Sequence, residues 1–292
     1  MGLAAARGII VISRTDRYNT RMNNEHTLHR QLSGTFGTLM HHEFTVKDDI
    51  YKPFAIEEWL CRQVGEGMVR PLIHVWRHER AFVLGLRDAR LPHAAEAMRW
   101  LAGEGFRVMV RNSGGAAVPL DAGVVNITWI QPLQQGDLRP QRDFELAAAW
   151  LQDELRRYGL SCDIGEVAGS YCPGDFDVSV RGRKFCGMAQ RRLQKAFSVQ
   201  AFVNVEGSAE ERAEWARRFY ERAAGGEVHA GALSVHAERM GSLRDLASGF
   251  PGAEQWIADL KRPHAQWTLP PIDASAVSEI VGLLKRRYDP RV

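Results

Sequence analysis

The feature that most restricts the fold is a series of short apolar segments, separated by glycines, between about residues 70 and 205. Segments such as LIHVWRH, FRVMVRN and FSVQAFVNV alternate large apolar residues with polar or small ones, which is typical of β-strands. Helical periodicity appears between them and dominates after residue 208. Many strands, with helices interleaved and then gathered at the end, predict an α+β fold in which helices flank a mixed β-sheet.

Local signals place several of these elements. The runs LIHVWRH and AFVLGL are separated by the charged pair Glu79-Arg80, which predicts a hairpin. Residues 56–64 and 143–158 have helical periodicity, the second ending at Gly159, and so does the segment HAAEAMRWLAGEG. Beyond residue 208 three more helices are expected, in AEERAEWARRFYERAAG, PGAEQWIADLKR and SAVSEIVGLLKRRY.

Composition divides the chain into three regions. Residues 1–40 are polar, aperiodic and rich in Asn, Thr and Arg, which predicts a flexible extension. Residues 41–225 hold the predicted strands and form the expected main domain. Residues 226–292 are predicted to be a helical extension that packs on this domain.

Charge and cysteine content exclude several classes of protein. The formal charge is +3 over 292 residues, and Lys and Arg are spread along the chain, which argues against a nucleic-acid-binding protein. No apolar run approaches the roughly 20 residues of a membrane span. The four cysteines form no CxxC pair and no cluster with His at metal-ligand spacing, so neither a metal site nor a disulfide scaffold is expected. These features indicate a cytoplasmic protein.

Four motifs are candidates for a functional site. RNSGGAAVPLDAGVVN, residues 111–126, places two glycines between apolar strands, where main-chain N–H groups can approach a bound ligand. GSYCPG, residues 169–174, puts a thiol in a turn that has no structural need of one. The other two are GRKFCGMAQRR at 182–192 and LGLRDARLP at 84–92.

Taken in order, these motifs resemble those of the lipoate/biotin protein ligase and octanoyltransferase superfamily. RNSGGAAV resembles its Arg-x-x-Gly-Gly-x-Ala-Val loop, and GRKFCGMAQRR resembles the segment that carries the family's lysine. A cysteine in the loop before the lysine strand, and Leu120 where many relatives have histidine, resemble one group within it. This group is the octanoyl-[glycine-cleavage H protein]:protein N-octanoyltransferases.

The resemblance implies a protein acyltransferase that needs no cofactor. Cys172 would attack the octanoyl or lipoyl amide on a lysine of the glycine-cleavage H protein and form a thioester. A lysine on the lipoyl domain of a 2-oxoacid dehydrogenase would then take the acyl group. Lys184 would hold and polarise the acyl carbonyl together with amides of the glycine loop.

The same resemblance implies the residues that bind the acyl group. The wall around it would comprise Arg111, Asn112, Ser113, Gly114 and Gly115, with Asp121 and Asn126 on the strand that follows and His78 near the acyl carbonyl or the substrate lysine.

The remaining cysteines have structural interpretations. Cys61 and Cys162 lie in apolar stretches and are expected to be inert, and Cys186 is expected to be a small packing residue.

Three alternatives remain open from the sequence. In the first alternative, the acyl donor would be an octanoylated acyl-carrier protein, and the Cys172 chemistry would be the same. An ATP-dependent lipoate ligase would need no nucleophilic thiol. A lipoyl-domain-binding protein without catalytic activity would need neither Cys172 nor Lys184.

Overall fold

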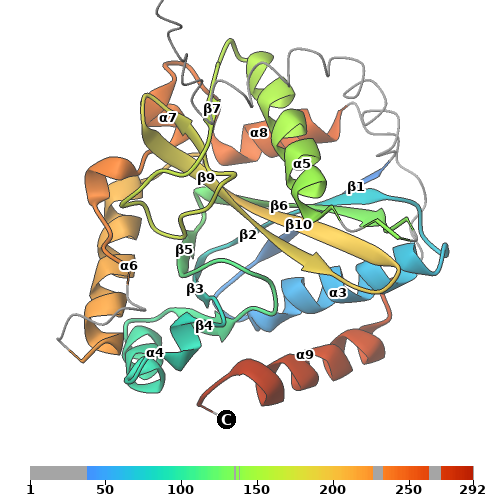
Figure 1. Ribbon diagram of the computed structural model, residues 1–292, viewed down its shortest axis with the longest axis horizontal. Helices are drawn as coiled ribbons and strands as arrows, with labels where there is room; N and C mark the ends of the chain where they lie inside the picture. The colour runs from blue at the N-terminus through green and yellow to red at the C-terminus, as the bar shows by residue number, and fades with distance from the viewer. Residues whose placement is uncertain (1–37, 135, 138, 226–232, 263–270, 292) are drawn as a thin grey trace, which may run out of the picture.

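The structure is a computed structural model that describes residues 38–134, 136–137, 139–225, 233–262 and 271–291. Most of the predicted N-terminal extension, residues 1–37, lies outside this part of the chain. The first described strand begins at Thr38, slightly before the predicted end of that extension. The α+β prediction is confirmed: helices cover both faces of a mixed sheet (Figure 1).

The main sheet has seven strands in the order β1-β2-β6-β10-β9-β8-β7. β1 pairs with β2 in parallel, and the other neighbours are antiparallel. Its strands are β1 Thr38–Phe44, β2 Leu72–His78, β6 Val124–Pro132, β7 Asp163–Ile164, β8 Val178–Val180, β9 Arg183–Arg192 and β10 Ala196–Asn204. A small sheet of order β4-β3-β5 contains β3 Arg80–Leu84, β4 Arg107–Val110 and β5 Val118–Asp121.

The predicted hairpin across Glu79 and Arg80 is wrong. Arg80 already belongs to β3, where it pairs with Asp121, so Glu79 alone joins the strands. The common tight hairpins need at least two loop residues, and a single one instead carries the chain from one sheet to the other. β2 therefore pairs with β1 and β6, and β3 with β4 and β5.

Helices lie on both faces of the main sheet, which explains why its strands are apolar on both sides. α3 and α9 lie on one face, and α5 and α8 on the other (Figure 1). On β6, Val125 and Ile127 point to the α5 and α8 side, whereas Thr128 points to α3. The α-helices are α3 Tyr51–Gly65, α4 Ala94–Gly103, α5 Pro140–Arg156, α6 Ala209–Ala223, α7 Leu243–Leu246, α8 Ala253–Lys261 and α9 Ala274–Tyr288, and the 3₁₀ turns are η1 Asp88–Arg90 and η2 Ala237–Arg239.

The helices near the C-terminus contribute to both hydrophobic cores. Trp256 and Leu260 of α8 are buried in the core beside α5, and Ile280 and Leu284 of α9 in the core beside α3. In the parts of the chain that the structure describes, no helix has both the length and the apolar composition that a bilayer crossing requires.

Candidate active site

Cys172 lies in the loop between β7 and β8, and its side chain is almost fully buried. Its φ is +49°, a left-handed conformation that side chains other than glycine rarely adopt. Residues held in such conformations cluster at functional sites, because the surrounding structure must hold them there. Among the described residues, Sγ accepts hydrogen bonds from the Ala116 N–H at 3.2 Å and from Nη2 of Arg111 at 3.4 Å.

The glycine loop, residues 111–118, brings both of these donors to the sulfur. The Arg111 guanidinium donates to the carbonyl oxygens of Gly114 and Ala116, at 2.9 and 2.8 Å, and so fixes the loop around itself. Gly115 has a φ of +86°, and a Cβ there would lie 2.4 Å from Arg111 Nη2 and 3.0 Å from the sulfur of Cys172. Only glycine fits this position. A guanidinium and an N–H group beside the sulfur are placed to stabilise negative charge on it.

Lys184 on β9 is fully buried beneath the Cys172 loop. Its ammonium group donates to the carbonyl oxygens of Tyr171, at 2.9 Å, and Cys172, and forms an ion pair with Asp177 at 2.8 Å. Two of its N–H groups are thus hydrogen-bonded to the main chain, and its charge faces the Asp177 carboxylate. In this structure Lys184 therefore holds the main chain of Cys172.

Asp177 was not assigned a role from the sequence, although it lies only three residues after the GSYCPG motif. Besides Lys184, it accepts a hydrogen bond from the Val167 N–H at 3.1 Å. Burial raises the pKa of its carboxyl group, and the neighbouring ammonium of Lys184 opposes this shift. Asp177 thus ties the start of the cysteine loop to the lysine beneath it.

A narrow cavity of about 20 Å³ opens beside Cys172 and Arg111. Most of its wall is apolar, including Phe54, Trp76, Val83, Val118, Leu120 and Phe202. An aliphatic chain with its carbonyl end at the sulfur would lie against these apolar side chains, which would have to move apart to admit it.

Glu57 on α3, which the sequence did not single out, gives one part of this cavity a polar wall. Its buried carboxylate accepts hydrogen bonds from Trp76 Nε1 at 2.8 Å, Thr128 Oγ1 at 2.7 Å and Gln200 Nε2, and lies 3.2 Å from His74 Nδ1. Gln200 is two residues along β10 from Phe202, on which the ring of Tyr171 stacks. Two residues of a strand span about 7 Å, so the carboxylate lies farther along the sheet than the Cys172 loop.

Of the predicted binding residues, several do lie around this cavity. Arg111 and Asn126 line it, and Gly114 and Gly115 form the turn that supports the sulfur. The hydroxyl group of Ser113 is buried and has no hydrogen-bond partner among the described residues.

Asn112 faces a neighbouring cleft instead. Its Nδ2 donates to Glu58 at 3.1 Å, and Glu58 also pairs with Arg191 and Arg62. The same cleft is lined by Arg286 and Arg287 of α9, which gives it a basic character.

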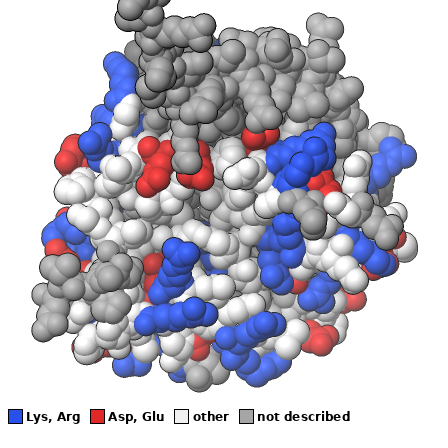
Figure 2. Space-filling model, viewed as in Figure 1, with Lys and Arg blue, Asp and Glu red and all other residues white. Residues whose placement is uncertain are grey.

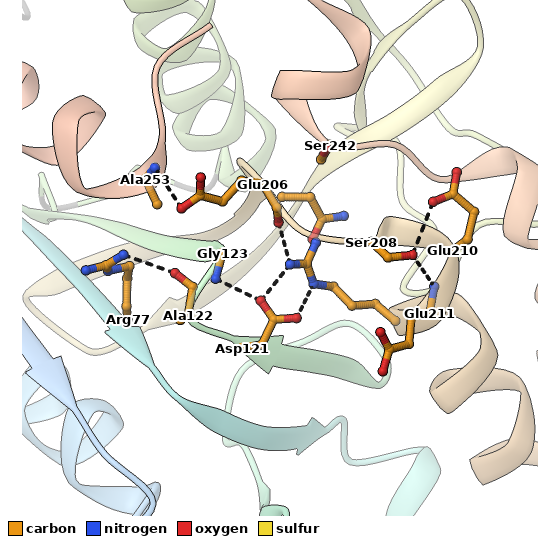
Figure 3. A network of polar contacts seen from close by, with 12 residues as sticks. Arg77, Asp121, Ala122, Gly123, Glu206, Ser208, Glu210, Glu211, Ser242 and Ala253 are labelled. Atoms are coloured by element: carbon orange, nitrogen blue, oxygen red, sulfur yellow. Dashed lines mark hydrogen bonds and ion pairs between the residues drawn. The ribbon is translucent and has the colours of Figure 1, made fainter.

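The structure does not bring His78 or Asp121 to the cavity. His78 is buried at the end of β2, where Nδ1 accepts the Arg80 N–H at 3.1 Å and burial lowers its pKa. Asp121 ends β5, and Figure 3 shows it in a network with Gly123 and Glu206. Both its oxygens accept from the buried guanidinium of Arg212, at 2.6 and 2.7 Å. This ion pair fastens α6 to the turn between β5 and β6.

The other three cysteines have the inert surroundings that the sequence predicts. Burial raises the pKa of Cys61 and of Cys162 to about 12, and that of Cys186 well above its ordinary value. All four cysteines are free thiols. Within the described residues, no group of three or more His, Cys, Asp or Glu side chains could hold a metal ion.

The sequence is similar to those of several known proteins. Residues 49–262 match the family model of the lipoyl protein ligase A/B catalytic domain. Octanoyl-[GcvH]:protein N-octanoyltransferase of Geobacillus kaustophilus is 44% identical over 179 residues, which cover 61% of this chain and 63% of that protein. The counterpart in Anoxybacillus flavithermus is 41% identical over 179 residues, 61% of this chain and 64% of its own length. The match therefore spans less than two thirds of these relatives.

A more distant relative aligns over more of its length, and the fold is shared with ligases. Lipoyl-[GcvH]:protein N-lipoyltransferase of Listeria monocytogenes is 34% identical over 228 residues, 77% of this chain and 81% of that protein. The crystal structure of lipoate-protein ligase A bound with ATP superposes with a TM-score of 0.63 and 19% identity, covering 85% of this chain and 94% of that one. At this identity the superposition establishes the fold alone.

Proposed function

Because the chain belongs to the lipoyl protein ligase A/B catalytic-domain family, we propose that it is a protein acyltransferase that works through a thioester on Cys172. The acyl group is octanoyl or lipoyl, the donor is the acyl-lysine of glycine-cleavage H protein, and the acceptor is a lysine of a lipoyl domain. The observation that carries the proposal is the sulfur of Cys172, held by Arg111 and an amide N–H at the wall of an apolar cavity. The names of the relatives support the choice of donor.

The reaction has two balanced steps. The Cys172 sulfur attacks the amide carbon of the acyl-lysine, the C–N bond breaks, and the donor lysine leaves as an amine that has gained the thiol proton. The acceptor lysine then attacks the thioester carbon, the C–S bond breaks, and its surplus proton returns to the sulfur. One amide is exchanged for another, so the overall reaction needs no ATP.

The two donors on the sulfur have a role in both steps. Negative charge gathers on the sulfur as the thiol proton leaves and again when the C–S bond breaks, and Arg111 and the Ala116 N–H stabilise it at both points. Since a thiol nucleophile must stay reduced, we propose the cytoplasm as the compartment.

The function is tested by offering three donors separately to the protein with a lipoyl domain as acceptor. Octanoylated H protein without ATP is expected to give acylated lipoyl domain. Transfer only from octanoyl acyl-carrier protein would keep the chemistry and replace the donor. Transfer only from free octanoate with ATP would refute the thioester mechanism in favour of a ligase.

Gly115→Ala is expected to slow acyl transfer by about a hundredfold, because the added Cβ displaces the loop that carries the Ala116 N–H. The matched control is Gly114→Ala. A Cβ at Gly114 meets no atom within 4 Å, so this variant should stay within about threefold of wild type. Steady-state transfer rates measure both. Equal effects of the two substitutions would contradict the role given to the loop.

Glu57→Ala is expected to shift acyl-chain preference toward longer chains. Removing this carboxylate extends the cavity, and each additional buried methylene contributes about 0.8 kcal/mol, so the decanoyl-to-octanoyl rate ratio should rise roughly tenfold. The control is Glu58→Ala, which removes an equally buried carboxylate that faces the neighbouring cleft. A ratio that changes equally in both variants, or in neither, would contradict the assignment.

A further inference from the structure

A buried carboxyl–phenol pair lies behind the glycine loop and has no part in the mechanism above. Asp88, from the motif LGLRDARLP, begins η1, and Tyr220 belongs to α6. Each is only 2% exposed, and the Tyr220 hydroxyl donates to Oδ1 of Asp88 at 3.0 Å. Neither Asp88 nor Tyr220 is among the described residues that line the cavity beside Cys172.

Tyr220 connects this pair to the glycine loop. Its hydroxyl oxygen accepts the Ala117 N–H at 3.1 Å. The preceding N–H, that of Ala116, is the one that donates to the sulfur of Cys172. Of these two consecutive N–H groups, that of Ala117 thus donates to the Tyr220 hydroxyl and that of Ala116 donates to the sulfur of Cys172.

Asp88 holds the loop from a second direction. Its Oδ2 accepts the Gly85 N–H at 2.8 Å. Gly85 packs directly on the loop, since a Cβ there would lie 1.9 Å from the Gly115 carbonyl oxygen. The preceding residue, Leu84, accepts the Arg111 N–H at 2.9 Å. The segment that contains Asp88 therefore supports both ends of the loop.

We propose that Asp88 and Tyr220 are positioning residues, which fix the glycine loop so that the Ala116 N–H meets the sulfur of Cys172. The proposal rests on the acyltransferase function proposed above. The pair acts through the loop and touches neither the acyl group nor the sulfur. Its loss should therefore lower the rate of thioester formation at saturating donor and leave the donor concentration for half-maximal rate nearly unchanged.

Tyr220→Phe and Asp88→Asn, singly and together, test this in the full chain. Each single variant is expected to slow thioester formation at saturating octanoylated H protein by about tenfold or more. Because both residues act through one chain of hydrogen bonds, the double variant should be no more than about threefold slower than the slower single variant. Two independent structural contributions would instead multiply.

Hydrogen exchange reports on the loop without any acyl substrate. In both single variants the amides of residues 112–118 should exchange about fivefold faster or more. The Ala117 N–H loses its acceptor in Tyr220→Phe, and in Asp88→Asn the carboxylate that holds this acceptor is gone. The control is Tyr158→Phe, which removes a similar hydrogen bond, 2.7 Å long, from Tyr158 in the turn after α5 to Asp259 of α8. Thioester formation and loop exchange should both stay at wild-type values in this control.

The outcomes separate the two proposals. Unchanged loop exchange, or faster exchange with a wild-type rate of thioester formation, would overturn the positioning role. Multiplicative effects in the double variant would overturn it as well. Failure of the wild-type protein itself to take an acyl group would refute the proposed function, and the exchange comparison would still decide whether the pair holds the loop.

Discussion

Cys172→Ser is expected to lower acyl transfer by about a thousandfold or more while the fold remains intact. Among the described residues, the hydrogen bonds to the sulfur come from Arg111 and the Ala116 N–H, and neither group can accept a proton. A thiol is nucleophilic without a strong base beside it, whereas a serine hydroxyl in the same place would have no base to activate it. Serine is nearly isosteric, so the free energy of unfolding should change by about 1 kcal/mol or less.

Intact mass spectrometry after incubation with octanoylated H protein measures this effect directly. The wild-type protein should gain the mass of one octanoyl group, and Cys172→Ser should gain none. Cys162→Ser is the matched control, because this cysteine is also buried but lies away from the cavity, against α5, and should leave the adduct unchanged. Transfer that persists in Cys172→Ser would contradict the thioester mechanism.

The secondary structure could be predicted largely because glycines and helical periodicity mark its boundaries. α4, α6 and α8 lie within the segments predicted for them, and β10 and α9 each begin one residue before theirs. The pairing of strands was harder to predict from the sequence, as the wrongly predicted hairpin at Glu79 shows. Local sequence gives the extent of a strand, but partners far along the chain decide which sheet it joins.

Some residues of the candidate site could likewise be predicted from the sequence, and others could not. Cys172, Arg111 and the two glycines lie in short motifs, so their resemblance to a family was visible in the sequence. Glu57 could not be recognised, because its position is fixed by hydrogen-bond donors on β2, β6 and β10, which no local pattern connects to α3. A carboxylate in an amphipathic helix ordinarily faces solvent.

Asp121 shows the opposite limit. The family resemblance implies that it lies near the acyl group, whereas in the structure it ends β5 and pairs with Arg212 of α6. It does not line the cavity beside Cys172. Where the end of β5 lies depends on the packing of α6, which the motif does not show.

The second large effect is expected at the ion pair between Lys184 and Asp177, beneath Cys172. Lys184→Met removes the ammonium from Asp177 and leaves a buried carboxylate without its partner, so the free energy of unfolding should fall by about 3–5 kcal/mol. It also removes the hydrogen bonds from Lys184 to the carbonyl oxygens of Tyr171 and Cys172. These hydrogen bonds help to keep Cys172 in its left-handed conformation. Both acyl transfer and thermal stability should therefore decrease, and the single variant cannot separate them.

The double variant Lys184→Met/Asp177→Asn separates the two effects. It leaves no unpaired buried charge, so thermal unfolding should show it to be more stable than Lys184→Met alone. Transfer should nevertheless stay about a hundredfold or more below wild type, because nothing replaces the contacts to the main chain of the cysteine loop. Hydrogen exchange of residues 167–174 without substrate should be faster than in wild type.

If the double variant regained wild-type transfer, Lys184 would be only the charge partner of Asp177. If transfer stayed low with unchanged exchange, Lys184 would act on the acyl carbonyl instead of holding Cys172.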